Sequence, residues 1–287
     1  MITLQEIIHK LDQFWQSNGC TVVCPYTTEL GAATLHPATV FGGLRGIETR
    51  ISYVQPVIRP TDGRTGCTSN RLYRHTQYQV LIAPPPENVK QLYFDSLRYL
   101  GMNTKKHDIR LINDNWEHPS IGAYGVGWEV WYDGMEITQL TYMQQLGTMQ
   151  CKLVPFEIAY GLERLAMCLQ DIDDVYHIQY DSFGTTYGEI YGMYEKHFGE
   201  VAFNVYSREY LLEQISLFQQ QITHLLGEKH YMVAYDFALK QSHCLNFLES
   251  RGYISNAEKA EFIFLIRNNI VDCLKLYKEF LTRGNNG

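Results

Sequence analysis

The sequence predicts an α+β fold: an antiparallel β-sheet flanked by helices and followed by a small C-terminal helical domain. Three observations lead to this prediction. Two apolar segments enclose a long turn, further segments between residues 108 and 145 alternate polar with apolar residues, and helical stripes replace strands after about residue 171. With 287 residues, 45% of them hydrophobic, the chain is long enough for one large and one smaller domain. We divide it into residues 1–170 and residues 171–287.

The N-terminus predicts a helix followed by a short strand. Thr3 and Glu6 have the spacing of a capping box, and one apolar stripe then continues to Trp15. A predicted strand at 20–24 ends at Pro25. By itself this pattern indicates an amphipathic helix that packs on a sheet.

A long hairpin is predicted next. Residues 53–58 and 76–82 have the composition of strands, and the segment between them is rich in Pro, Gly, Asp, Asn and Ser. Four arginines lie in or beside this turn, namely Arg59, Arg64, Arg71 and Arg74. In a chain with a formal net charge of -7, such a cluster is either a solvated face or an anion site, and forked guanidinium groups suit phosphate. The residues alone leave both interpretations open.

Three more strands are predicted between residues 108 and 145. They cover 109–112, 128–131 and 135–142, and Asp133 with Gly134 marks a tight turn between the last two. Together with the hairpin, these segments are sufficient for an antiparallel sheet that helices cover on one face.

Beyond residue 171 the pattern predicts helices joined by short loops. One apolar stripe runs from Leu211 to Leu225, Ser255 and Glu258 have capping-box spacing, and a second stripe ends near Leu281. The first of these helices is rich in glutamine, at Gln214, Gln219, Gln220 and Gln221. A solvated face and a subunit contact both explain that composition.

The cysteine content favours a reducing compartment. Seven cysteines form an odd number without a dense framework, and no basic and apolar leader precedes Leu4. No apolar run approaches the roughly 20 residues needed to span a bilayer, so we expect a cytoplasmic protein without membrane contact. Cys20 and Cys24 share one face of a predicted strand and the histidines have no ligand spacing, so we expect buried thiols and no structural zinc.

A second segment far along the chain changes how the hairpin is interpreted. In FEIAYGLERLAM, residues 156–167, a glycine precedes Glu-Arg at a helix start. With the hairpin, this segment resembles the class II aminoacyl-tRNA synthetases, whose second motif is an arginine strand, a loop and an aromatic strand, and whose third is a glycine turn into Glu-Arg. The pattern QP-x-x-RPTDGR-x-G…NRL, residues 115–145 and YGLERLAM are similar to the α subunit of bacterial heterotetrameric glycyl-tRNA synthetases. This similarity covers nearly the whole chain, which has no Gly-x4-Gly-Lys-Ser/Thr loop.

The resemblance implies a class II synthetase-type catalytic core in residues 1–170 and the activity of a glycine–tRNA ligase. ATP and glycine would give glycyl adenylate and pyrophosphate, and the glycyl group would pass to tRNA(Gly) together with a β subunit. The glycine carboxylate is already ionised at neutral pH, so the first step needs no general base. Positioning and charge neutralisation must supply the rate.

The resemblance also implies an ATP site, in which Arg59 and Arg164 are the expected catalytic residues. Arg59 would bind the α-phosphate as charge builds there, and Arg164 would cover the adenine and reach the γ-phosphate. An arginine at a helix start is unfavourable unless an anion is present, which supports this role for Arg164. Tyr78 would stack on the other adenine face, or simply pack within its strand. Arg64 and Arg71 would contact the outer phosphates, the tRNA end or solvent.

Two carboxylates are expected to hold Mg²⁺ bound with ATP. They are Glu136 and Glu157, because a cation that bridges phosphates usually takes one or two carboxylates. For either of them, a salt bridge to a hairpin arginine is the alternative. Selecting glycine means excluding larger amino acids, so rigid, bulky groups should form the wall of that pocket. The expected glycine-binding residues are Thr34, Gln77, Gln79, Trp116 and Glu129.

The resemblance further implies partners. It implies a homodimer formed through the N-terminal helix and strand, and an α2β2 assembly with a β subunit. A protein that grips tRNA by itself needs a broad basic surface. This chain has a pI of about 5.8 and gathers its arginines in one hairpin. We therefore expect tRNA(Gly) to be bound mainly through the β subunit.

The chain departs from the family pattern beside its arginines. Val57 and Ile58 stand where Ser-Arg is common, and Thr65 and residues 67–69 differ in the loop. These departures leave a second function open, that of a synthetase-like paralogue that binds nucleotide or a partner without charging tRNA. A third, adenylation of another acceptor, shares the first half-reaction.

Overall fold

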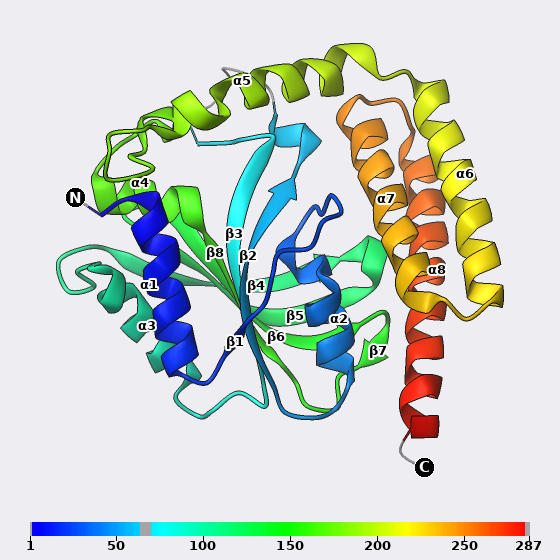
Figure 1. The fold of residues 1–287 in the computed structure, drawn as a ribbon, viewed down its shortest axis with the longest axis horizontal. Coiled ribbons are helices and arrows are strands. Elements are labelled where there is room, and N and C mark those ends of the chain that lie inside the picture. The colour runs from blue at the N-terminus through cyan, green and yellow to red at the C-terminus, as the bar shows by residue number, and fades with distance from the viewer. Residues whose placement is uncertain (1, 64–69, 285–287) are drawn as a thin grey trace.

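The computed structural model describes residues 2–63 and 70–284 and confirms the α+β architecture (Figure 1). At its centre lies one sheet with the strand order β1-β2-β3-β8-β6-β5-β4, in which β7 also pairs with β6. Among the described pairs, β1 and β2 are parallel and all the others are antiparallel. The strands are β1 (Thr21–Val22), β2 (Thr49–Ile58), β3 (Arg74–Ala83), β4 (Ile109–His118), β5 (Ala123–Tyr132), β6 (Met135–Leu146), β7 (Met149–Gln150) and β8 (Phe156–Gly161).

The predicted hairpin is formed by β2 and β3. Their pairing runs from Ile58 opposite Arg74 to Thr49 opposite Ala83, and β8 lies between β3 and β6. Successive side chains of a strand point to opposite faces of its sheet. The odd-numbered residues of β3 therefore share one face, and the even-numbered residues share the other.

Helices cover one face of this sheet around the largest apolar core. They are α1 (Leu4–Ser17), α3 (Val89–Leu100) and α4 (Leu162–Gln170). Thr3 and Glu6 form the predicted capping box, and the Trp15 side chain on the inner face of α1 is fully buried. This arrangement confirms the amphipathic helix packed on a sheet. β1 is shorter than the predicted strand, and Cys24 beyond its end is exposed rather than buried.

The remaining helices form a second group beside the sheet. They are α2 (Pro37–Leu44), α5 (Tyr187–Glu200), α6 (Arg208–Gly227), α7 (Tyr231–Ser250) and α8 (Asn256–Gly284). Short turns are η1 (Ala33–Leu35), η2 (Pro60–Asp62), η3 (Pro119–Ile121), η4 (Val175–His177) and the π-helical η5 (Val201–Val205). Figure 1 shows α6, α7 and α8 side by side, while α5 extends from the region of α4 past the tip of the β2–β3 hairpin. In the described part of the chain, no helix is both long and apolar enough to cross a membrane.

The change from sheet to helices occurs near the predicted position, because α4 ends at Gln170 after the last described strand. The boundary between two domains nevertheless stays a prediction. Val175, Ile178 and Tyr187 pack into the same apolar core as α1 and the sheet. On the other side, α2, α7 and α8 share a second core with the ends of β5 and β6.

Gln219 of the glutamine-rich helix α6 belongs to a buried amide network. Neither predicted interpretation of this helix, a solvated face or a subunit contact, anticipated that position for Gln219. Gln241 of α7 donates to Ile215 O at 3.1 Å and to Gln219 Oε1 at 3.1 Å. Asn269 of α8 donates to Gln219 Oε1 at 2.7 Å and to Gln241 Oε1 at 2.9 Å. The three amides therefore fix how α6, α7 and α8 face one another, since buried polar groups require partners.

We expect Gln241→Leu to destabilise the protein although leucine has a similar size. The change removes one of the two acceptors of the Asn269 amide, which keeps Gln219 Oε1, and removes the side-chain donor to Ile215 O, which costs about 1–3 kcal/mol. Urea unfolding followed by circular dichroism measures the effect, with Gln221→Leu on the exposed face of α6 as the matched control. Equal midpoints for the two variants would show that the network does not stabilise the bundle.

Candidate active site

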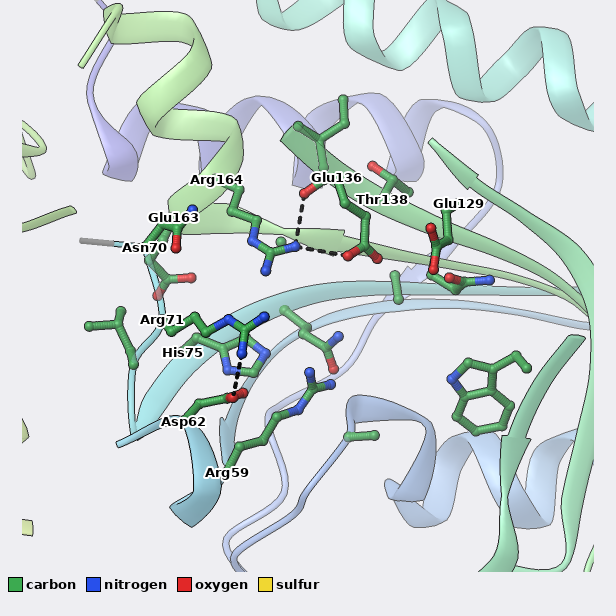
Figure 2. A pocket seen from close by; sticks show the side chains of 18 of the residues that line it. Arg59, Asp62, Asn70, Arg71, His75, Glu129, Glu136, Thr138, Glu163 and Arg164 are labelled. Carbon is green, nitrogen blue, oxygen red and sulfur yellow. Dashed lines mark hydrogen bonds and ion pairs between the residues drawn. The ribbon is translucent and has the colours of Figure 1, made fainter. Parts of the chain in front are cut away.

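One pocket of about 260 Å³ opens on the sheet face opposite α1 (Figure 2). It is lined by side chains of β3, β4, β5, β6, β8 and α4, and by residues around the tip of the hairpin. Most of the predicted site residues line it, namely Arg59, Arg71, Gln77, Trp116, Glu129, Glu136, Glu157 and Arg164. Thr34, Gln79 and Tyr78 do not, and Arg64 lies outside the described residues.

Two arginines reach the pocket from the hairpin. Arg59 follows the last residue of β2, where its backbone N–H donates to Tyr73 O at 2.8 Å and its Nε donates to Gly31 O at 3.1 Å. Arg71 lies on the other side of the turn, with Nη1 3.9 Å from Asp62 Oδ1. Hydrogen bonds therefore hold Arg59 at a fixed position, whereas the exposed Arg71 has a single long ion pair.

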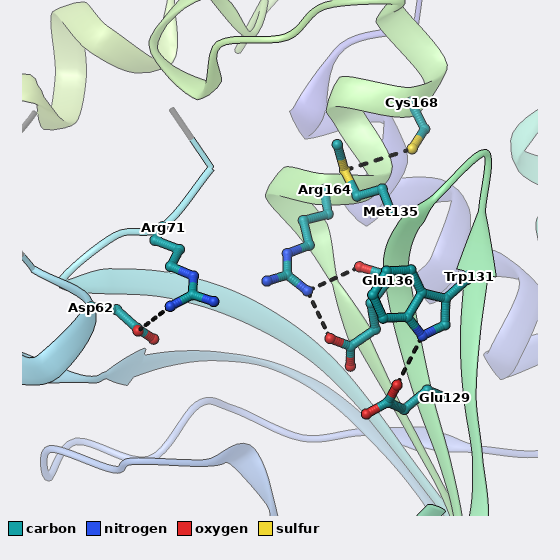
Figure 3. Close-up of polar contacts among 8 residues, drawn as sticks. All are labelled: Asp62, Arg71, Glu129, Trp131, Met135, Glu136, Arg164 and Cys168. Carbon is teal, nitrogen blue, oxygen red and sulfur yellow. Dashed lines mark hydrogen bonds and ion pairs between the residues drawn. The ribbon is translucent and has the colours of Figure 1, made fainter. Parts of the chain in front are cut away.

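Arg164 enters from the opposite side, in the first turn of α4. Its Nη1 donates to Glu136 O at 3.1 Å and to Glu136 Oε2 at 2.9 Å (Figure 3). The N-terminus of a helix carries partial positive charge, which disfavours a cation there unless a negative charge lies nearby. Glu136 supplies that charge in the absence of a ligand. Its salt bridge is formed with Arg164 and not with a hairpin arginine.

Glu163, the neighbour of Arg164, anchors α4 to the hairpin. Both of its carboxylate oxygens lie 2.9 Å from Thr76 N, and the Tyr187 hydroxyl donates to Oε1 at 3.4 Å. Burial raises the pKa of Glu163 to about 7, although the Thr76 N–H opposes that rise. Glu163 therefore binds the backbone of β3, while the Arg164 side chain reaches the pocket.

His75 lies in the pocket between the two arginines. Burial lowers the pKa of His75 well below its usual value, and the charges of Arg59 and Arg164 lower it further. The imidazole is therefore neutral at neutral pH. Its ring lines the same pocket as Arg59 and Arg164 (Figure 2).

The predicted stacking role of Tyr78 does not fit its position. As an even-numbered residue of β3, Tyr78 points to the sheet face that α1 covers, and its side chain is fully buried there. The hydroxyl donates to Asp12 Oδ1 of α1 at 2.9 Å and to Ser52 Oγ at 3.2 Å. Tyr78 therefore packs within its strand, which was the alternative interpretation. The ring of β3 that faces the pocket is that of His75.

Glu157 lies at the buried end of the pocket. The Thr34 hydroxyl donates to its Oε1 at 2.6 Å, while Oε2 is buried without a hydrogen-bond partner. Burial raises the pKa of Glu157 to about 7, and the hydrogen bond from Thr34 opposes that rise. Both amide atoms of Gln79 are also buried without partners. Thr34 therefore holds Glu157 from behind, and neither Thr34 nor Gln79 lines the pocket.

The other predicted glycine-binding residues line the pocket itself. Gln77 Oε1 accepts a hydrogen bond from Ala33 N at 2.8 Å, which orients its amide. Glu129 Oε2 accepts from Trp131 Nε1 at 2.8 Å, and the Trp116 ring contributes a rigid wall from β4. The pocket therefore combines arginines at one end with a buried carboxylate and an indole at the other.

A single cation cannot bind both predicted metal ligands. Glu157 pairs in register with Thr141 of β6, five positions from Glu136, which corresponds to about 17 Å along the strand. Within residues 2–63 and 70–284, no group of three or more His, Cys, Asp or Glu side chains could hold a metal ion. Of the two, Glu136 is the carboxylate near the arginines.

Helix α5 holds the start of β3 next to this pocket. Glu195 accepts hydrogen bonds from Tyr73 N at 2.7 Å and from Arg74 N at 3.0 Å. The Arg74 guanidinium lies against two rings of the same helix, with its Cζ 5.4 Å from the centroid of Tyr191 and 5.2 Å from that of Tyr194. These contacts fix Tyr73 and Arg74, which lie between Arg71 and His75.

Val57 and Ile58, which depart from the family pattern beside Arg59, both pack against apolar neighbours. The Val57 side chain is fully buried, and Ile58 packs with Tyr73 and the helices α6 and α7 in a third apolar cluster. Thr65 and residues 67–69 lie outside the described residues.

The sequence analysis missed His75, Glu163 and Glu195. Strand alternation could have identified His75, since it has the same parity as Gln77 in β3. Glu163 belongs to the Glu-Arg motif, but that motif does not indicate its contact with Thr76, and no local pattern marks Glu195.

We expect Glu195→Ala to loosen the start of β3. It removes two hydrogen bonds to a carboxylate, each worth about 1.5–3 kcal/mol, so amide hydrogen exchange at Tyr73 and Arg74 should become at least ~10-fold faster. Glu195→Gln keeps an acceptor oxygen and should give an intermediate rate, and Lys196→Ala on the exposed side of α5 is the control. Unchanged protection in Glu195→Ala would contradict the anchoring role.

Comparison with known proteins is consistent with these features. The chain matches the family described as "Glycyl-tRNA synthetase alpha subunit" over residues 4–281. It is 42% identical over 274 residues to the glycine–tRNA ligase alpha subunit of Petrotoga mobilis (strain DSM 10674 / SJ95), covering 96% of this chain and 95% of that protein.

A similarity in structure was also found. The structure of a pyrrolysyl-tRNA synthetase from Desulfitobacterium hafniense matches with a TM-score of 0.41 and 14% sequence identity, over 62% of this chain and 71% of that chain. The family match spans nearly all of the sequence, including every residue that lines the pocket. The chain therefore belongs to the glycyl-tRNA synthetase α-subunit family.

Proposed function

We propose that this pocket is where the chain, as the catalytic α subunit of a glycine–tRNA ligase, activates glycine with ATP. The observation that carries the proposal is the convergence of Arg59, Arg71 and Arg164 at one end of a pocket whose other end holds the buried Glu157. Phosphates suit the first end, because arginine presents fixed, forked donors to their oxygens. An ammonium group suits the second end.

At the phosphate end, Arg59 and Arg164 are the proposed catalytic residues. Arg59 is held by its backbone and by Gly31, so its guanidinium is positioned before ATP arrives. Negative charge that builds on the α-phosphate meets a fixed positive group, which lowers the barrier without reorganisation. Arg71 and the predicted Arg64, which lies outside the described residues, are proposed to bind the outer phosphates.

The adenine is proposed to lie against His75 instead of Tyr78. The His75 ring lines the pocket beside Arg164, and it stays neutral because burial and two arginines lower its pKa. A neutral imidazole can stack on a purine, while Arg164 covers the other side through its planar guanidinium.

At the other end, Glu157 is proposed to bind the ammonium group of glycine. Its Oε2 has no partner among the described residues, and a buried carboxylate left in that state favours a cationic ligand. Thr34, Gln77, Gln79 and Glu129 complete the proposed polar surroundings, and Trp116 excludes larger side chains. This assignment replaces the expected role of Glu157 as a metal ligand.

The reaction requires little beyond positioning. Glycine held by its ammonium group presents an ionised carboxylate towards the α-phosphate, so attack needs no proton removal. Mg²⁺, when bound with ATP, would neutralise charge on the departing pyrophosphate. Glu136 is the carboxylate near the arginines that would help to hold it, through the oxygen that Arg164 does not bind.

The partners follow from family membership and from surface properties. We propose an α2β2 assembly with a β subunit, in which tRNA(Gly) is bound mainly by that subunit because this chain carries a net charge of -7. The homodimer is proposed to form at α1 and at β1, which occupies an edge of the sheet. The described cysteines are free thiols, which supports a cytoplasmic location.

Exchange of pyrophosphate into ATP tests this function. With the β subunit present, exchange should depend on glycine, and Arg59→Ala should reduce it by about 10²–10³-fold because a fixed charge at the reacting phosphate is lost. Arg110→Ala, an exposed arginine on β4, is the control and should keep full exchange. If no amino acid supports exchange, the result favours the non-catalytic paralogue. If exchange depends on an amino acid other than glycine, glycine is not the substrate.

The pH dependence of glycine use tests the role of Glu157. Because its carboxyl has a pKa of about 7, it is protonated below that pH and lacks the charge that holds an ammonium group. We expect kcat/KM for glycine to rise with pH up to about 7 and then level off. Glu157→Gln should lower kcat/KM for glycine by about 10–100-fold and abolish this rise, with KM for ATP unchanged. A change confined to ATP would instead support the metal role.

A further inference from the structure

A second pocket of about 100 Å³ lies between the hairpin and the C-terminal helices. It shares no lining residue with the first pocket. Segments distant in sequence form it: the ends of β2 and β3, the C-terminal half of α5, the turn η5 and the last part of α7. Its walls contain five aromatic rings, those of Tyr73, Tyr194, Phe198, Tyr206 and Phe247.

These rings pack against one another as a continuous lining. Tyr194 and Phe198 stack with centroids 3.9 Å apart, and Phe198 lies 5.7 Å from Tyr73. Tyr206 meets Phe247 edge to face at 5.1 Å. Aromatic faces carry negative potential, so a small space enclosed by several rings attracts positive charge.

Two polar groups in this lining have no partner. The exposed carboxylate of Glu29 forms no ion pair or hydrogen bond with any side chain or backbone group in the described part of the protein. His243 Nδ1 is buried and likewise makes no hydrogen bond there. Burial lowers the pKa of His243 and Glu29 raises it, with the first effect larger, so the imidazole is neutral at neutral pH. The charge of Glu29 is therefore uncompensated.

One ring of this lining, that of Tyr194, already lies against a cation. The Arg74 guanidinium lies over Tyr194, with its Cζ 5.2 Å from the ring centroid, and over Tyr191 at 5.4 Å. Arg74 does not line the second pocket. Tyr194 thus already packs against a guanidinium group that lies outside the second pocket.

We propose that the second pocket binds an alkylammonium or guanidinium group. Glu29 supplies the opposite charge, the rings supply their faces, and His243 Nδ1 accepts an N–H hydrogen bond when the ring proton is on Nε2. An anion would meet the Glu29 carboxylate, and a neutral apolar ligand would leave that carboxylate partly dehydrated without gain. The cation is either a free amine or the tip of a lysine or arginine side chain from a partner subunit.

Such a ligand would contact the backbone that positions Arg59. Ile58 and Tyr73 both line the second pocket, and Tyr73 O accepts the hydrogen bond from Arg59 N at 2.8 Å. Neighbouring hairpin residues therefore line the two pockets, Arg59 the first and Ile58 the second. Binding itself does not depend on the proposed glycine activation.

Saturation-transfer NMR with the full-length chain tests the cation site. The probes are n-butylammonium chloride and, as a neutral analogue of the same shape, n-butanol, at matched ionic strength. We expect saturable binding of the ammonium at millimolar concentration and at least ~10-fold weaker binding of the alcohol. Glu29→Gln should weaken ammonium binding by about 10-fold, which corresponds to ~1.4 kcal/mol.

Control variants test whether binding depends on the Glu29 carboxylate or on negative surface charge in general. Glu87→Gln, at another exposed glutamate, should bind the ammonium as the unchanged protein does. Phe198→Leu removes a half-exposed ring without touching Glu29 and should also weaken binding. Equal binding of alcohol and ammonium, or equal affinities in Glu29→Gln and Glu87→Gln, would overturn the proposal.

Repeating the titration with the β subunit bound identifies the source of the cation. If the β subunit blocks n-butylammonium, a basic side chain of that subunit occupies the pocket. If the affinity is unchanged, the pocket remains open in the assembly and serves a free amine. Both outcomes support the cation site and differ only in its occupant.

Discussion

The gathering of two guanidinium groups, those of Arg59 and Arg164, at one pocket is the constraint on which the rest of the site depends. Dehydration lowers the pKa of Arg59, Asp62 and Glu136 raise it, and Arg164 lowers it again. His75, between the two arginines, loses its proton for the same reasons. Nearby carboxylates offset part of this repulsion, and an anionic ligand would offset the rest. The unliganded protein thus already has the charge arrangement that a polyphosphate requires.

Buried carboxylates that bind backbone N–H groups hold this arrangement in place. Glu163 uses both oxygens on Thr76 N, and Glu195 accepts from the backbone of Tyr73 and Arg74. One carboxylate comes from α4 beside Arg164, the other from α5. Backbone N–H groups at and just before the start of β3 are therefore bound by carboxylates from two helices.

Most of the fold could be predicted from the sequence, because local signals determine it. Capping at Thr3, alternation in 53–58 and 76–82 and the stripes after residue 171 each match a described element. The site was predicted less completely. Tyr78 was assigned by motif, whereas strand parity turns it to the covered face and brings His75 to the pocket. Glu195 lies more than a hundred residues from its partners, so only the folded chain reveals its contact.

Every residue that lines the first pocket lies between Ala32 and Arg164, yet that stretch is not self-sufficient. A fragment ending at Gln170, where the regular sheet domain stops, would retain the complete lining and lose both Tyr187 and Glu195. The smallest piece of this chain able to keep its arginine hairpin in shape therefore extends through α5. Residues 171–200 therefore belong with the sheet in any fragment that keeps this pocket in shape.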